Sequence, residues 1–265
     1  MKTDNIRKRH KAHSIYLSKA IDILQQRGEI EFPISLEVFT SLSSSLESIF
    51  TGILNCVDEL NLYACSILYR SLIEHFYKGF ILMNELVKNK SDEASEHYQQ
   101  HLFVAEFIAE QMGALESEDI ISGNNIKPDV LKYILEKYPS IEIEKENQRE
   151  ISAATKKFSF REIIKKLHLD FSNEFANKPV ADFFTKMLPE YSRFSTFVHG
   201  GPYAQKISKN LTNNGLDDEL YRLSEISLTM LCTIKEQLIM CFRLSREEAT
   251  PILTTLCNLR AENDN

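Results

Sequence analysis

Apolar residues recur every three or four positions between residues 39 and 60, and serines fill the positions between them. Such spacing draws one apolar stripe along an α-helix, because about 3.6 residues complete a turn. The pattern predicts an amphipathic helix that packs through this stripe. Its apolar members are Phe39, Leu42, Leu46, Ile49, Phe50, Ile53, Leu54 and Val57.

The next segment, residues 61–87, is apolar on most sides (NLYACSILYRSLIEHFYKGFILMNELV). A helix of this kind belongs in the centre of a bundle. No segment has the alternation of a convincing strand, so we expect an all-α fold, a single bundle of long amphipathic helices with a C-terminal helical pair. Further helical patterns cover 92–115, 128–138, 158–171, 180–199, 217–244 and 246–262.

The chain divides by composition into three expected parts. Residues 1–30 form a basic N-terminal helix, 33–202 a helical core with a polar pocket, and 203–265 C-terminal helices that pack on the core. The charged stretch 139–157 is the best candidate for a linker, and the Asn- and Gly-rich residues 205–219 suggest a polar loop.

Composition narrows the setting in which this bundle works. The 265 residues carry a net charge of −7, which argues against general coating of nucleic acid or of an anionic membrane. No apolar run approaches the roughly 18 residues of a membrane span, and the basic N-terminus lacks the apolar core of a secretory signal. The five cysteines form no C-x-x-C pair and fit reduced thiols. We therefore expect a cytoplasmic protein without a membrane segment.

Candidate chemistry lies in YSRFSTFVHGGPY, residues 191–203. A histidine exchanges protons near neutral pH, and a guanidinium holds phosphate oxygens in a fork. The spacing of Arg193 and His199 resembles the motif of the HEPN superfamily, whose RNases need no metal because RNA supplies its own 2′-OH nucleophile. Three other pairs fit the same loose spacing, so context has to decide: Arg7 with His13, Arg70 with His75, and Arg161 with His168. The alternative is that His199 only caps a helix that Gly200-Gly201 ends.

A second polar group lies inside the most apolar helix. Arg70 and Glu74 are four residues apart, which makes them neighbours on one helix face. Ser195 and His199 have the same spacing in the later segment. The charged pair is either a structural ion pair within the bundle or part of a polar pocket that binds a ligand.

Two blocks, YRSLIEHFYKG and YSRFSTFVHGGP, resemble an uncharacterised bacterial all-helical family with R-[SA]-x-x-E and S-x-x-x-H-[GP] segments. This resemblance implies that Arg70, Glu74, Ser195 and His199 are its polar site residues. The Arg-x5-His spacing is similar to the HEPN superfamily, all-helical domains that include many metal-independent RNases.

The HEPN likeness implies a HEPN-like topology and a homodimer. It also implies a defence or toxin effector that acts on RNA or a nucleotide, with Arg193 stabilising the scissile phosphate and His199 as acid or base. Lys206 and Lys209 would then close over a bound phosphate as a lid.

A different class of function stays open. The same pocket would suit a non-catalytic helical module that binds a partner protein, a small ligand or a nucleotide. The pair His97 and His101 has a spacing able to hold a metal, but no H-E-x-x-H accompanies it and the face is polar. We therefore expect neither a metal nor a cofactor.

Overall fold

The computed structural model describes residues 2–26, 31–122, 153, 156–173, 178–210 and 213–242. Within these residues every regular element is helical and there is no strand, which confirms the predicted all-α class. The elements are α1 (Lys2–Gln26), α2 (Pro33–Asp58), α3 (Leu62–Asn89), α4 (Glu93–His97), the π-helix η1 (Tyr98–Leu102), α5 (Phe103–Ser122), α8 (Phe160–Asn173), α9 (Lys178–Val198), α10 (Pro202–Asn210) and α11 (Asn213–Cys241).

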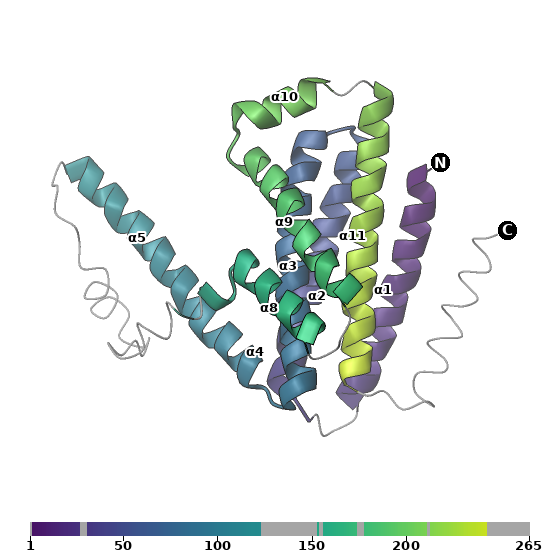
Figure 1. The fold of residues 1–265 in the computed structure, drawn as a ribbon, viewed down its shortest axis with the longest axis vertical. Helices are drawn as coiled ribbons and strands as arrows, with labels where there is room; N and C mark the ends of the chain where they lie inside the picture. The colour runs from purple at the N-terminus through teal and green to yellow at the C-terminus, as the bar shows by residue number, and fades with distance from the viewer. Residues whose placement is uncertain are drawn as a thin grey trace.

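Helices α2, α3 and α11 pack against one another and contain most of the hydrophobic core, with α1 alongside α11 (Figure 1). The apolar helix expected at the centre is α3, where Tyr69, Leu72, Ile73 and Tyr77 are fully buried. Helix α11 also contributes to this core, since Leu223 and its apolar neighbours are fully buried.

Helix α9 crosses in front of α3, and α8 packs against both (Figure 1). Aromatic side chains fill the interface that α9 shares with α3. The Phe194 ring lies edge-on to Tyr69, with centroids 4.9 Å apart, and Phe197 meets Tyr63 in the same way at 5.5 Å. These contacts fix the position of α9, the helix that carries Arg193 and Ser195.

The region predicted as one helix over 92–115 is built from three elements, since the π-helix η1 joins α4 to α5. Asp92 fixes its start by accepting hydrogen bonds from the backbone N–H groups of Ile34 (3.2 Å) and Ser35 (2.8 Å) at the first turn of α2. Carboxylates are favourable at this position because the N–H groups of a first helical turn lack partners within the helix. Beyond η1, α5 extends away from the bundle (Figure 1).

The prediction of a polar loop at 205–219 is wrong, because α10 covers 202–210 and α11 starts at Asn213. Pro202 opens α10, a position where its fixed φ suits a helix. Ala204 is fully buried and Ile207 packs against the core, so α10 has an apolar face that the composition of the stretch concealed. The predicted helices at 128–138 and 246–262 lie outside the described residues.

No described helix has the length and apolar character that crossing a membrane would require.

Candidate functional site

Arg70, Glu74 and Ser195, predicted from separate segments, meet between α3 and α9. Arg70 donates from Nε to Ser195 Oγ (3.0 Å) and from its two terminal nitrogens to the Glu74 carboxylate (3.2 and 3.0 Å). Tyr191 completes this Arg70 cluster, since its hydroxyl accepts from Arg70 at 2.6 Å and donates to Glu74. All three guanidinium nitrogens are therefore occupied by protein groups.

Tyr191 is the member of the Arg70 cluster that the sequence analysis missed. It stands four residues before Ser195, so the spacing that paired Ser195 with His199 also places Tyr191 on the same face. Its ring stacks on Phe160 at 4.0 Å and lies under the Arg70 guanidinium, 4.8 Å from ring centroid to Cζ. Partial burial and its bond to Glu74 raise the pKa of Tyr191, so the hydroxyl keeps its proton as a donor.

Arg193 lies in a different environment, facing α11. Its guanidinium donates to Glu219 at 3.0 Å and rests over the Phe194 ring, with Cζ 5.2 Å from the centroid. Arg222 also binds Glu219, at 2.9 and 3.1 Å, and reaches Glu190 at 3.0 Å. Although burial alone would raise it, bonds from Arg222 and Arg193 lower the pKa of Glu219. Glu219 therefore stays charged and is shared by the two arginines, and Glu190 supplies a second carboxylate to Arg222.

His199 lies at the end of α9, where the chain adopts a Schellman motif. The N–H of Gly200 donates to Phe197 O (3.2 Å) and that of Gly201 to Thr196 O (3.3 Å), with Gly200 at φ 63°. These are the two bonds that define this helix ending. The His199 side chain is exposed, and its imidazole has no hydrogen bond or ion pair within the described part of the chain.

The structure thus brings Arg70, Glu74 and Ser195 together but gives Arg193 to Glu219 and leaves His199 in solvent. Lys206 and Lys209, expected on a phosphate-binding loop, are exposed residues of helix α10. Sequence periodicity alone could not reveal that Glu219 takes up Arg193, because this pairing depends on how α9 packs against α11.

A serine, a histidine and a glutamate also converge where α1 meets α2. Ser14 Oγ lies 3.4 Å from His10 Nε2 and donates to Glu47 at 2.8 Å, and His10 Nε2 also contacts Glu47. A hydrolytic triad needs the two ring nitrogens of the histidine to face different partners. Here one nitrogen faces both, and Glu47 also binds the fully buried Lys235. These four residues form the Lys235 network, which joins α1 to the core.

The cysteines offer no activated nucleophile among the described residues. Cys56, Cys65, Cys232 and Cys241 are free thiols. Burial raises the pKa of Cys65 and of Cys232 to about 12, which keeps both protonated and unreactive near neutral pH. No group of acidic, histidine or cysteine side chains able to hold a metal occurs in this part of the chain.

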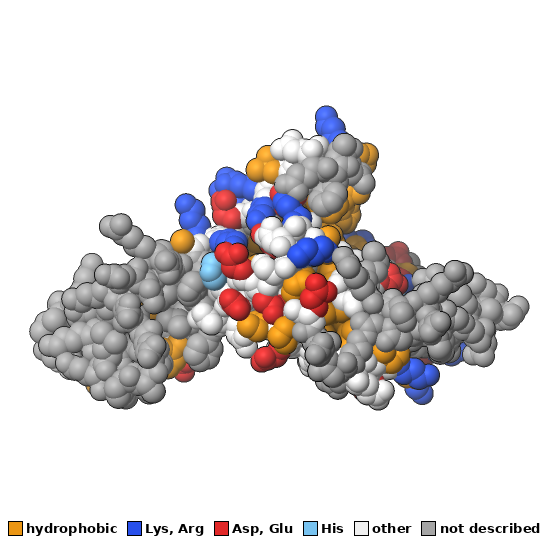
Figure 2. Space-filling model, turned by 90° about the horizontal axis from the view of Figure 1, so that it is seen from below, with side chains coloured by type: hydrophobic (Ala, Val, Ile, Leu, Met, Phe, Trp, Pro, Cys, Tyr) orange, Lys and Arg blue, Asp and Glu red, His pale blue; other side chains and the backbone are white. Residues whose placement is uncertain are grey.

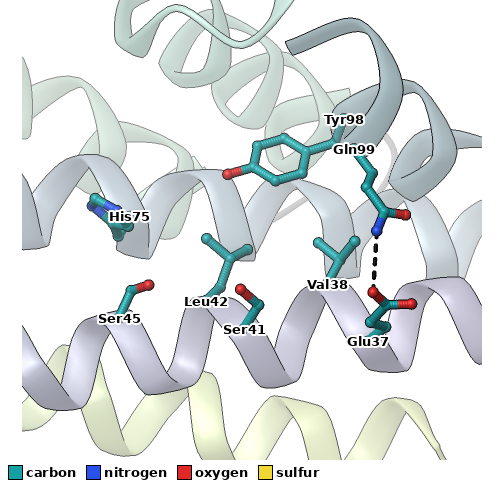
Figure 3. A pocket seen from close by; sticks show the side chains of 8 residues that line it. All are labelled: Glu37, Val38, Ser41, Leu42, Ser45, His75, Tyr98 and Gln99. Atoms are coloured by element: carbon teal, nitrogen blue, oxygen red, sulfur yellow. Dashed lines mark hydrogen bonds between the residues drawn. The ribbon is translucent and has the colours of Figure 1, made fainter. Parts of the chain in front are cut away.

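A pocket of about 190 Å³ opens between α2, α3 and the π-helix (Figure 3). Val38 and Leu42 supply its apolar floor, and we call it the α2–α3 pocket. Its polar lining comes from Glu37, Ser41 and Ser45 of α2, His75 of α3, and Tyr98 and Gln99 of η1. Gln99 donates to Glu37 at 3.2 Å and so fastens the π-helix to α2 at one end of the pocket.

The serines of this pocket differ from their neighbours on α2. Thr40, Ser44 and Ser48 each donate to the backbone carbonyl four residues earlier, at 2.8 to 3.1 Å. By contrast, the hydroxyls of Ser41 and Ser45 have no partner among the described residues. They are thus available to a ligand.

His75 has a defined orientation in the pocket. Its Nδ1 lies 2.8 Å from Ser71 O, and since a carbonyl only accepts, Nδ1 carries the proton. In the neutral ring Nε2 is then a hydrogen-bond acceptor. The Tyr98 hydroxyl points along the pocket toward the His75 end (Figure 3). Burial first, and then Glu106, raise the pKa of Tyr98 to about 12, so its hydroxyl remains a donor.

Comparisons with family models, with curated proteins and with solved structures found no match to this chain. The resemblance to the HEPN superfamily and to the bacterial helical family therefore stays a prediction.

Proposed function

We propose that this protein is a non-catalytic helical module that binds a small ligand in the α2–α3 pocket. One contrast carries the proposal. The polar groups of the Arg70 cluster are all paired with protein, whereas Ser41 and Ser45 in the pocket have no partner among the described residues. A concave, largely apolar site with a few convergent polar groups is what small ligands require.

The π-helix supports the same assignment. A π-helical turn is rare because it interrupts the regular hydrogen bonding of an α-helix, and such turns are frequent at functional sites. In this chain it presents Tyr98 and Gln99 to the pocket from consecutive positions. Asp92 and the buried Ser35–Ser95 hydroxyl pair (2.9 Å) hold the preceding α4 against α2. The pocket wall is therefore anchored to the bundle.

The predicted RNase activity gains less support. A guanidinium that stabilises a phosphorane must bind phosphate oxygens, whereas one terminal nitrogen of Arg193 already donates to Glu219. At the end of the bundle opposite α10, which Figure 2 shows from below, blue and red side chains lie interspersed, so the described part of that end presents no continuous basic surface. The homodimer, the defence or toxin role and the partner protein stay predictions.

Ligand-observed NMR with a library of small polar ring compounds tests the proposal, using two matched variants. Ser45→Leu fills the pocket, whereas Ser44→Leu adds the same side chain at the preceding position of α2, which is exposed to solvent. We expect compounds that bind the wild type and Ser44→Leu but not Ser45→Leu. Binding that all three proteins share, or none at all, would reject the pocket as the binding site.

Incubation with labelled RNA in EDTA tests the competing activity. We expect no cleavage above the buffer control. Cleavage by the wild type that disappears in His199→Ala would restore the nuclease and overturn the non-catalytic assignment.

A further inference from the structure

The charges around the α2–α3 pocket limit what enters it. Among its described lining residues Glu37 is the only carboxylate, and neither a lysine nor an arginine occurs. A bound phosphate or carboxylate would lose water without gaining a permanent positive partner, which is costly in a partly enclosed site. The pocket therefore favours an uncharged ligand over an anionic one.

The hydrogen-bonding groups define a complementary pattern. Ser41, Ser45 and Tyr98 present hydroxyl donors, while Nε2 of the neutral His75 ring presents an acceptor because Nδ1 carries the proton that Ser71 O accepts. Glu37 keeps one carboxylate oxygen beyond the one that accepts from Gln99. A ligand that satisfies both sets carries at least one N–H donor and at least one acceptor, such as a ring nitrogen or a carbonyl.

Size and shape narrow the class further. An apolar protein cavity of about 150 Å³ holds benzene, and this pocket measures about 190 Å³. It therefore has room for a single or small fused ring. Val38 and Leu42 form an apolar floor opposite the Tyr98 ring in Figure 3, a slot suited to a flat molecule.

We infer that the α2–α3 pocket binds an uncharged, flat nitrogen heterocycle of nucleobase size, with an N–H group on His75 Nε2 and its acceptors on the serine and Tyr98 hydroxyls. This ligand class rests on the proposed function, since it assigns the occupant of the same pocket.

Adenine is the probe for the proposed ligand class, and benzoate and toluene are control ligands that lack its hydrogen-bonding pattern. Benzoate is a flat anion without an N–H group, and toluene is an apolar ring without polar atoms. Isothermal titration at pH 8 against wild type, Ser44→Leu and Ser45→Leu should show adenine binding that only Ser45→Leu abolishes. Neither benzoate nor toluene should bind in the α2–α3 pocket.

The outcomes distinguish a wrong ligand class from a wrong binding function. If benzoate or toluene binds in a Ser45→Leu-sensitive way and adenine does not, the ligand class is wrong while the binding function survives. If no probe and no library compound binds in that way, both fail.

Two conservative variants test the hydrogen bonds themselves. His75→Phe removes the acceptor, and Tyr98→Phe removes the hydroxyl while keeping the ring. Each should weaken adenine about five- to tenfold, the loss expected for one hydrogen bond, with circular dichroism unchanged. Adenine affinity that neither variant alters would overturn the proposed recognition.

Discussion

Replacing Glu47 by glutamine removes the carboxylate that faces Lys235, a side chain with no exposed surface. Glu47 itself is 25% exposed and also binds His10 and Ser14 of α1. Without it, the Lys235 ammonium stays in the core beside a neutral amide. Leaving a buried charge without its partner costs about 3–5 kcal/mol.

The electrostatics of the folded protein give a similar magnitude. Burial alone would raise the pKa of Glu47, but hydrogen bonds from His10 and Lys235 and the Lys235 charge lower it from 4.5 to about 2. A carboxyl with this lowered pKa contributes about 3 kcal/mol of stability near neutral pH. We expect Glu47→Gln to reduce the free energy of unfolding by about this amount.

Urea unfolding followed by circular dichroism measures the effect, and Asp58→Asn is its control. Asp58 also joins α1 to α2, through Arg7, but the two side chains are 49% and 40% exposed. Such a surface pair contributes about 0.5 kcal/mol. A Glu47→Gln variant no less stable than Asp58→Asn would refute the assigned role of the buried pair.

The same pair predicts a dependence on pH. Because the folded pKa of Glu47 is lowered, its contribution is complete above 4.5 and is lost as the pH falls toward about 2. The stability difference between wild type and Glu47→Gln should therefore shrink across this range. A difference that stays constant from pH 5 to the acid limit of folding would contradict it.

Two further substitutions test the elements around α9. Glu74→Ala should cost only about 1–2 kcal/mol in urea unfolding, since Arg70 keeps Ser195 and Tyr191 and the ion pair is partly exposed. A loss as large as that of Glu47→Gln would show that the Arg70 cluster is buried more deeply. Gly200→Ala should lower the melting temperature, because φ 63° costs a residue with a Cβ about 1–2 kcal/mol. Gly201→Ala, where a Cβ would have 3.9 Å to its nearest atom, is the control, and an equal effect would contradict the Schellman ending.

The spacing of apolar residues predicted much of this fold, because an α-helix depends on contacts between residues three and four positions apart. The apolar repeat of α2, the central position of α3 and the end of α9 at Gly200 all follow from neighbours within a few residues. The family resemblance had grouped Arg70, Glu74 and Ser195 with His199, and the structure brings the first three of these side chains together. Contacts between residues far apart in the chain could not be predicted from the spacing of apolar residues. The pairing of Arg193 with Glu219 is an example.

The α2–α3 pocket could not be found in the sequence for a different reason. Its polar lining comes from α2, α3 and a π-helix, and no residue pattern in YQQHL distinguishes a π-helix from an ordinary helical turn. Its serines looked like the solvated face of an amphipathic helix. Only the position of η1, set by Asp92 at the start of α2, turns part of that face into a pocket.

The nitrogen resonances of the His75 ring provide the most direct test of ligand binding in the α2–α3 pocket. In the free protein, long-range proton–nitrogen NMR should show a proton on Nδ1 of His75, as the bond to Ser71 O requires. Saturating adenine should shift Nε2 as it accepts a hydrogen bond, and Ser45→Leu should abolish the shift. If adenine leaves the His75 Nε2 resonance unchanged, the proposed ligand binding is wrong, whatever the other six histidines show.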